Sequence, residues 1–191
     1  MVETKTNSYG PILSCVKKDF VFFLILSRFR IDHILGFFRI WEIPTHAVTG
    51  LLGRFQPSLP IWRNELEGRG FWDLDRLTKP YIRQHLLERF LGEYVNVIPT
   101  YFNERGTGIY ELKGEYSTEK QIAAALPLTG ENAQKNFVIK SALWACVQNV
   151  VLLQDSEDAN KFYPRIECMK TTSFAELEGW QQHHIRDLYI E

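Results

Sequence analysis

The sequence predicts an α/β protein in which a strand-forming amino-terminal part precedes a mostly helical part. Residues 20–26 form a continuous apolar run, which is typical of a buried strand in a parallel sheet. The run is far shorter than the stretch of about 20 residues that a membrane helix needs. Apolar residues then recur every four positions from Ile82 to Tyr94, as on the buried face of a helix. Thr118 and Ser173 each begin a capping-box pattern, which marks the start of a helix.

Bulk composition places the chain among ordinary globular proteins. Of its 191 residues, 45% are hydrophobic and 24% are charged, close to the averages for globular domains. The net charge of −1 gives no electrostatic attraction to nucleic acid or to an anionic membrane, so we expect neither partner. Cys15, Cys146 and Cys168 are odd in number and lack metal-ligand spacing. This pattern favours a reduced, cytoplasmic setting, and we expect no cofactor.

Arg30, Asp32 and His33 form the most distinctive polar group of the sequence. If this segment is extended, Arg30 and Asp32 point to the same face, because side chains alternate along a strand. The guanidinium of Arg30 would then lower the pKa of Asp32 and keep the carboxylate ionised. An ionised carboxylate at a strand end can act as a covalent or electrostatic catalyst. The alternative is a structural ion pair, which the four residues Arg-Ile-Asp-His favour on their own.

The elements that follow this group are expected to be short. We expect a helix from Thr45 to Leu52, because Thr45 can serve as its N-cap and Gly53 can end it. Residues 54–60 contain two prolines and are predicted to form an extended connection.

Residues 78–188 show alternating helical and extended patterns. Thr78 and Pro80 are expected to open the helix whose apolar positions continue to Tyr94. The later elements are predicted in this order: a hairpin over 101–113 around Gly106–Gly108, a short helix after Thr118, a helix over 131–148, a strand over 150–153, and a final helix from Ser173 to Leu188.

The segment from Arg30 to Arg54 resembles the 4-alpha-glucanotransferases, which are also called amylomaltases or disproportionating enzymes. The resemblance rests on Arg-Ile-Asp-His, the aromatic and aliphatic run after it, Trp41 with Ile43-Pro44, and the string Thr-Gly-Leu-Leu-Gly-Arg that ends at Arg54. These enzymes are (β/α)8 (TIM) barrel proteins related to the alpha-amylases. The resemblance therefore implies that residues 1–56 are a segment of an incomplete catalytic barrel that carries the nucleophile motif.

The resemblance also implies roles for individual residues. Asp32 would be the nucleophile that forms a glucosyl-enzyme intermediate, and Arg30 would orient it. His33 would lie close to the sugar at the cleavage point, and Trp41 would line the acceptor side. The family transfers alpha-1,4-glucosyl or glucan segments from maltose or maltodextrins to glucose or polysaccharide acceptors. The resemblance implies that the configuration at the anomeric carbon is retained through two successive displacements. Such a mechanism requires a second carboxyl group roughly 5–5.5 Å from the first.

Residues 57–191 resemble the insertion that splits the barrel in plant-type cytosolic disproportionating enzymes. The clearest part is the string from Glu65 to Ile82, which includes Gly-Phe-Trp-Asp-Leu-Asp-Arg-Leu. The resemblance implies a mostly helical insertion in a cytoplasmic enzyme that acts on maltose, maltodextrins and branched alpha-glucans such as starch or glycogen.

The chain is shorter than the about 250 residues of a typical (β/α)8 barrel. It also lacks the Gly-Glu-Asp-Leu-Gly segment in which the family carries its acid/base glutamate. We therefore expect an internal piece of the enzyme that is inactive alone. The alternative is a noncatalytic module that binds glucan or acts as a scaffold.

The aromatic and histidine residues allow several interpretations. Trp144 and Trp180 lie on helical stripes and are expected in the core. Trp62 and Trp72 lie in an irregular stretch and could belong either to the core of the insertion or to a glucan-binding surface. His33 and His46, with Glu42, lack His-Glu-x-x-His spacing, so ordinary polar contacts are favoured over a zinc site. His183 and His184 are expected on a solvated helix face, with metal binding as the much less favoured alternative.

Overall fold

The computed structural model describes residues 38–190 of the chain. The predicted strand over residues 20–26 and the residues Arg30, Asp32 and His33 lie outside this range. The chain divides into two compact units. Within the described range, the first unit comprises residues 38–40 and 55–57, and the second comprises residues 41–54 and 58–190. The predicted domain boundary between residues 56 and 57 stays a prediction.

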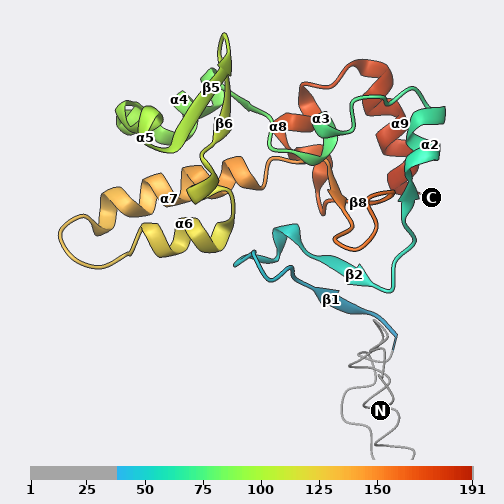
Figure 1. Cartoon of the computed structure of the whole chain (residues 1–191), viewed down its shortest axis with the longest axis horizontal. Coiled ribbons are helices and arrows are strands. Elements are labelled where there is room, and N and C mark those ends of the chain that lie inside the picture. The colour runs from blue at the N-terminus through green and yellow to red at the C-terminus, as the bar shows by residue number, and fades with distance from the viewer. Residues whose placement is uncertain (1–37, 191) are drawn as a thin grey trace, which may run out of the picture. The chain divides into compact units, whose positions relative to one another are not determined.

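The described residues form a mixture of short strands and helices (Figure 1). The strands are β1 (Ile40–Glu42), β2 (Arg54–Gln56), β3 (Ile61–Trp62), β4 (Ile82–Arg83), β5 (Phe102–Gly106), β6 (Ile109–Leu112), β7 (Leu152–Gln154) and β8 (Lys161–Pro164). The helices are α2 (Arg63–Gly68), α3 (Asp75–Thr78), α4 (Gln84–Leu91), α5 (Ile98–Tyr101), α6 (Glu119–Ala125), α7 (Ala133–Val147), α8 (Thr172–Ala175) and α9 (Gly179–Ile190). Short 3-10 turns occur at Gly50–Leu52, Gly92–Val97, Gly114–Tyr116 and Cys168–Lys170.

The strands form small sheets, and no barrel closes within the described range. β1 and β2 form a two-stranded sheet, and two three-stranded sheets have the orders β3-β8-β7 and β4-β6-β5. All the pairs in these two larger sheets are antiparallel. The α/β class is thus confirmed, whereas a parallel barrel sheet is not seen in residues 38–190. The predicted hairpin is also confirmed, as β5 and β6 with a bulge between Glu104 and Gly106.

The first hydrophobic cluster of the second unit is built on α7. This helix lies between α4 and α6 and packs against both (Figure 1). Its buried residues are Ile139, Ala142, Leu143, Cys146 and Val147. They cover more of its circumference than the single stripe of a surface helix, because the helix has a partner on each of two sides. The predicted helix over residues 131–148 is therefore confirmed, but its buried face is wider than the sequence pattern indicated.

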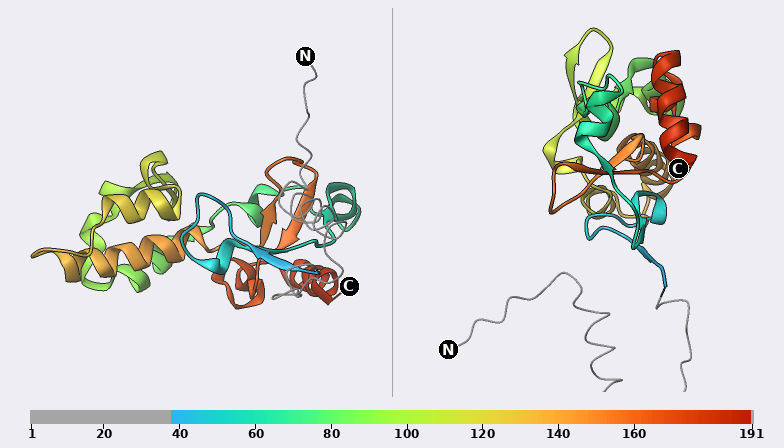
Figure 2. Two further views of the ribbon diagram at one scale, coloured as in Figure 1. Left: turned by 90° about the horizontal axis from the view of Figure 1, so that it is seen from below. Right: turned by 90° about the vertical axis from the view of Figure 1, so that its right-hand side faces the viewer.

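The second cluster packs the β3-β8-β7 sheet with α2, α3, α8 and α9. Its fully buried members include Leu66, Leu152 and Phe162. The consecutive residues Val150 and Val151 belong to the first and second clusters respectively, so the two clusters meet where α7 leads into β7. Figure 2 shows the helices α6 and α7 at one end of this unit and α8 and α9 at the other.

Asn149 joins the two clusters through hydrogen bonds. Its Nδ2 donates to the carbonyl oxygen of Tyr81 at 2.9 Å, and its Oδ1 accepts from the backbone N–H of Ser173 at 2.9 Å. Asn149 is buried, so losing either partner would leave a polar atom without water or protein contact. The polar side chain thus fixes the entry to β4 and the start of α8 relative to the end of α7.

Several predicted helix boundaries are wrong. The turn Gly50–Leu52, capped by Thr49, replaces the helix expected over residues 45–52. The helix expected to open at Thr78 and Pro80 begins only at Gln84, because Thr78 ends the separate helix α3 and residues 82–83 form strand β4. It ends at Leu91 instead of reaching Tyr94, because Gly92 adopts a φ of 54° that breaks the helical path.

The capping box at Ser173 is also absent. Thr171 caps α8, its hydroxyl accepting from Phe174 N–H at 3.1 Å, and the final helix α9 begins only at Gly179. Ser173 is fully buried, and its hydroxyl and carbonyl oxygens accept from the guanidinium of Arg76 at 2.8 and 2.9 Å. The serine therefore serves a tertiary contact that its local pattern does not reveal.

The capping box at Thr118 is confirmed and gives a stability prediction. The Thr118 hydroxyl accepts from Gln121 N–H at 3.3 Å, and the Gln121 side chain accepts from Thr118 N–H at 3.1 Å. We expect Thr118→Ala to lower the free energy of unfolding by about 1 kcal/mol, measured by urea denaturation. Thr107→Ala, at the exposed tip of the β5–β6 hairpin, is the control and should change it by less than about 0.5 kcal/mol. Equal effects of the two substitutions would contradict a role for the cap.

Candidate functional site

Of the predicted site residues, Trp41 lies in the described range. It begins the stretch of residues 41–54, here called the 41–54 segment, which follows the Arg-Ile-Asp-His motif in the sequence. Trp41 is half-buried, and its indole Nε1 donates to the carbonyl oxygen of Gly50 at 3.2 Å. A Cβ atom at Gly53 would lie 2.8 Å from both the indole Cε2 of Trp41 and the carbonyl oxygen of Glu42. Glycine at this position therefore allows the indole and the backbone to approach each other closely.

Glu119 fastens the 41–54 segment to helix α6. Its Oε2 accepts from the backbone N–H groups of Val48 and Thr49 at 2.5 and 2.7 Å. Its Oε1 accepts from the hydroxyl of Thr49 at 2.9 Å and from Nε2 of Gln148 at 2.6 Å. The side chain of Glu119 is fully buried. Both carboxylate oxygens are thus engaged, and the donors come from two distant parts of the chain.

The pKa of Glu119 lies below its ordinary value of 4.5. Burial acts to raise this pKa, but the hydrogen bonds from Thr49, Gln148 and Val48 lower it by a larger amount. All the hydrogen-bonding groups around the carboxylate are donors, which favours the ionised form. Glu119 also occupies the first turn of α6, where the helix dipole favours a negative charge.

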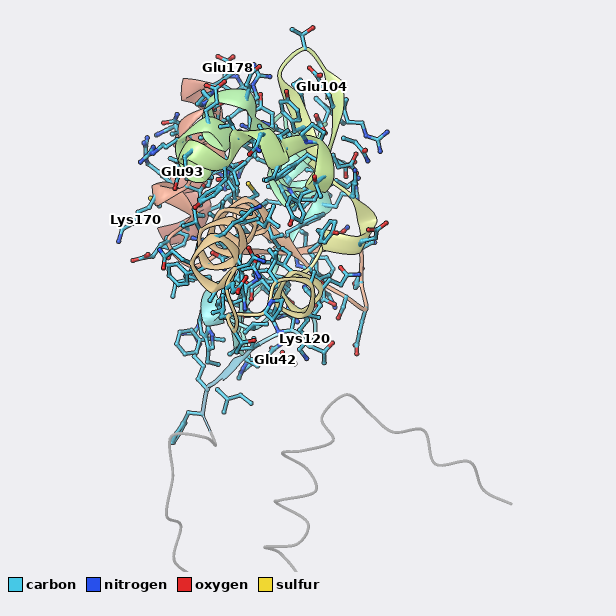
Figure 3. The ribbon with its side chains drawn as sticks, turned by 90° about the vertical axis from the view of Figure 1, so that its left-hand side faces the viewer. Glu42, Glu93, Glu104, Lys120, Lys170 and Glu178 are labelled. Carbon is cyan, nitrogen blue, oxygen red and sulfur yellow. The ribbon has the colours of Figure 1, made fainter. Side chains whose placement is uncertain are left out.

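Two further hydrogen bonds hold the junction between the 41–54 segment, α6 and α7. The indole Nε1 of Trp144, on α7, donates to the carbonyl oxygen of Glu119 at 3.0 Å. The backbone N–H of Lys120 donates to the carbonyl oxygen of His46 at 3.2 Å. The half-buried Trp144 therefore serves this junction as well as the first hydrophobic cluster. Figure 3 shows Glu42 and Lys120 near the same end of the described residues, with Glu104 and Glu178 near the other.

The carboxy-terminal end of the 41–54 segment is held by an ion pair. Arg54 lies 2.9 Å from the carboxylate of Asp155, and its guanidinium lies over the ring of Tyr163, 3.8 Å from the centroid. The pKa of Asp155 is lowered: burial opposes the shift, but the N–H of Glu157 and the side chain of Arg54 stabilise the ionised form. Because both side chains are largely shielded from solvent, this pair is screened less than an exposed one.

The two cysteines of the described range are not candidate nucleophiles. Cys146 and Cys168 are buried and unbonded to each other. Burial raises the pKa of the Cys146 thiol to about 12 and that of Cys168 to about 11. Since the thiolate is the reactive form, both remain protonated and inert near neutral pH.

The predicted site residues divide between described and undescribed parts of the chain. Arg30, Asp32 and His33 lie outside the described range, so their predicted roles stay predictions. Trp41 lies at the start of the 41–54 segment, and its predicted role toward an acceptor sugar also stays a prediction. In the sequence, Glu119 is simply the residue that follows the expected helix cap Thr118. No sequence signal marks it as buried, because its partner Thr49 lies 70 positions away.

The tryptophans and histidines of residues 57–190 occupy several environments. Trp62 and Trp72 are exposed, with Trp72 at 79%. The prediction that Trp180 is a core residue is wrong, because this side chain is 46% exposed, although its ring packs on Phe71. His184, expected on a solvated face, is half-buried against Trp180. Within residues 38–190, we find no group of three or more potential ligands that could hold a metal ion. No helix in that range has the length and apolar character to cross a membrane.

Comparison with known proteins gives a match over most of the chain. Residues 3–182 match the family described as 4-alpha-glucanotransferase. The chain is 44% identical, over 169 residues, to 4-alpha-glucanotransferase DPE2 of Oryza sativa subsp. japonica. This similarity covers 86% of the chain but 18% of the relative, so the chain spans less than a fifth of that protein's length. No solved structure matches the chain.

The close approach at Gly53 predicts a specific loss of stability. We expect Gly53→Ala to lower the free energy of unfolding by about 1–3 kcal/mol, because the new methyl group would overlap the Trp41 indole and the Glu42 carbonyl. Gly50→Ala is the matched control, because its methyl group would meet Trp41 at an ordinary contact distance of 3.5 Å. Urea denaturation followed by tryptophan fluorescence measures both. Unchanged stability of Gly53→Ala would show that the segment does not pack in this way.

The buried carboxylate of Glu119 predicts a pH-dependent stability. Its pKa is lower in the folded than in the unfolded chain, so its contribution is present above the unfolded value near 4.5 and is lost as the pH falls through the folded value. At pH 7, Glu119→Gln should cost about 1–3 kcal/mol, because an amide NH2 would face another donor.

The measurement is thermal unfolding of the original chain and of Glu119→Gln between pH about 7 and about 3. The difference in Tm should shrink toward the acidic end. Glu115→Gln, at an exposed residue just before the same helix, removes the same charge and controls for a general change of charge. A Tm difference that stays constant over the whole range would contradict an ionised, buried Glu119.

Proposed function

The chain belongs to the 4-alpha-glucanotransferase family, and we propose that it forms part of an enzyme that moves glucose units between alpha-glucans. The enzyme would transfer alpha-1,4-glucosyl or glucan segments from maltose or maltodextrins to glucose or polysaccharide acceptors. The observation that carries this proposal is the 44% identity over 86% of the chain. The family match also spans residues 3–182, so it includes Arg30, Asp32 and His33.

The proposed reaction is a retaining double displacement. In the first step, a carboxylate oxygen of Asp32 attacks the anomeric carbon of the donor. The glycosidic bond breaks, and a second carboxyl group donates its proton to the departing 4-oxygen. In the second step, that group takes the proton from the 4-hydroxyl of the acceptor. The acceptor oxygen then attacks the anomeric carbon and releases Asp32, so configuration is retained over the two inversions.

The other predicted site residues would support this chemistry. Arg30 would keep Asp32 ionised and orient it, because a neighbouring guanidinium stabilises a carboxylate. His33 would hydrogen-bond to the sugar at the cleavage point. Trp41 would present an apolar ring face on the acceptor side, with its indole held by Gly50. The short hydrogen bonds that the Glu119 carboxylate accepts from the backbone N–H groups of residues 48 and 49 would keep the rest of this segment in place.

The chain would need the remainder of the enzyme for catalysis. It lacks the Gly-Glu-Asp-Leu-Gly context of the family's acid/base residue and spans 18% of its relative. We therefore propose that the chain is inactive alone, and that the second carboxyl group comes from another part of the protein. We further propose that the complete protein is cytoplasmic and acts on maltose, maltodextrins and branched glucans such as starch or glycogen.

A second candidate function is a noncatalytic module that binds glucan or acts as a scaffold. The observation that favours it is the exposure of Trp62 and Trp72, whose ring faces could stack on sugar rings. This module would retain sugar binding without bond cleavage. Catalytic turnover by the complete protein that depends on Asp32 would exclude it.

Substitution of the nucleophile tests the proposed function. In the complete protein, Asp32→Asn should lower glucose release from maltose by on the order of 10³-fold or more, because an amide cannot form the covalent intermediate. Glu157→Gln, an exposed residue of the insertion, removes one negative charge as the control and should leave the rate unchanged. Glucose is measured with a coupled enzyme assay.

Undiminished glucose release by Asp32→Asn would remove Asp32 from the mechanism. The chain of 191 residues, assayed alone, should release no glucose. Turnover by this chain alone would instead contradict the proposal that the second carboxyl group lies elsewhere.

A further inference from the structure

A small hollow lies where the 41–54 segment meets the turn after strand β7. It has a volume of about 130 Å³ and is partly open to solvent. Its apolar lining comes from Pro44, Leu52 and Leu153. Its polar lining includes Glu42 and His46 from the segment, Gln154 at the end of β7, and Ser156 from the turn that follows. The hollow therefore combines residues that precede the predicted insertion with residues from its carboxy-terminal half.

The two walls of the hollow are fastened to each other and to the core. The ion pair between Arg54 and Asp155 joins the segment to the turn at 2.9 Å. The amide Nε2 of Gln154 donates to the carbonyl oxygen of Ala159 at 3.0 Å, which fixes the turn itself. On the segment side, Leu52 is buried in the first hydrophobic cluster. A hollow with walls held in this way is largely formed before any ligand arrives, which lowers the cost of binding.

The size of the hollow limits what it can hold. Binding sites for drug-sized molecules measure about 300–1,000 Å³, whereas an engineered cavity of about 150 Å³ in another protein holds one benzene molecule. A volume of about 130 Å³ is slightly smaller than the benzene cavity, and a glucopyranose ring with its hydroxyls is larger than benzene. The hollow therefore suits one edge of a single sugar ring, whose other edge stays on the open side. A glucan chain would reach it only through the single ring at its end.

The charges around the hollow favour a neutral ligand. Arg54 is already paired with Asp155, so its charge is not available to a phosphate group or a carboxylate. Glu42 would repel an anion. Its carboxylate, the imidazole of His46, the amide of Gln154 and the hydroxyl of Ser156 are hydrogen-bonding groups that match sugar hydroxyls. The apolar lining offers a surface for the C–H groups of a pyranose ring.

We propose that this hollow binds a single glucopyranose ring, supplied either as free glucose or as the terminal unit of an alpha-glucan. The inference rests on the proposed function for the choice of sugar. It adds a sugar site to which the insertion contributes Gln154 and Ser156. Through these two residues, the insertion takes part in recognising a small sugar instead of serving only as a structural addition.

Binding by the whole chain tests the proposal. The ¹⁵N-labelled chain is titrated with glucose, with maltoheptaose, and with sorbitol, which carries glucose-like hydroxyls without the ring. Glucose should cause saturable shifts of backbone amide signals within residues 42–54 and 153–156, and sorbitol should not. Maltoheptaose shifting the same signals indicates the terminal unit of a glucan as a ligand, and glucose acting alone indicates the free sugar; both results support the site.

Two substitutions locate the binding. Ser156→Tyr fills the hollow and should weaken glucose binding by about tenfold or more, as judged from the titration midpoint. Glu157→Tyr places the same bulk one position away, at an exposed residue outside the lining, and should change the midpoint by less than about twofold. His46→Ala removes an exposed polar group of the lining and should also weaken binding, which provides a second test if Ser156→Tyr does not fold.

Three results would overturn the proposal: shifts outside both lining segments, equal shifts with sorbitol, or glucose binding to folded Ser156→Tyr that equals binding to the original chain. None of them bears on the nucleophile. Loss of turnover in Asp32→Asn together with any of these results would leave the proposed function intact and remove only the sugar site.

Discussion

The buried carboxylate of Glu119 is the interaction on which the described structure most depends. It accepts hydrogen bonds from Val48, Thr49 and Gln148, so it joins the 41–54 segment to both α6 and the end of α7. A carboxylate without these donors would be costly to bury, and the donors without it would be left unsatisfied. The arrangement is therefore stable only as a whole, and it fixes the backbone of the segment more firmly than apolar contacts alone would.

This interaction gives the predicted insertion a structural role toward the segment that precedes it. Residues 57–191 resemble an addition to a catalytic barrel, yet the 41–54 segment that precedes them belongs to the same compact unit. The segment is held by Glu119 near its middle and by Asp155 at its end. Both of these acidic residues lie within residues 57–191, the predicted insertion. In the proposed enzyme, the insertion would thus stabilise a segment that follows the nucleophile by only a few residues in the sequence.

The sequence predicted features that depend on local spacing and missed those that depend on distant partners. The capping box at Thr118 and the hairpin around Gly106–Gly108 were correct, because each requires only residues a few positions apart. The similar pattern at Ser173 failed, because Arg76 and Asn149 engage that residue from 97 and 24 positions away. The burial of Glu119 and the exposure of Trp180 could not be predicted for the same reason. The roles of Arg30, Asp32 and His33 rest on resemblance and lie outside the described residues.

The most direct test of the central claim is amide hydrogen exchange at Val48 and Thr49. If the ionised Glu119 holds these N–H groups, their exchange should be strongly protected in the original chain at neutral pH. Protection should fall in Glu119→Gln, while the amides within α7 stay protected. Exchange of Val48 and Thr49 at the rate of a solvent-exposed loop in the original chain would contradict the account.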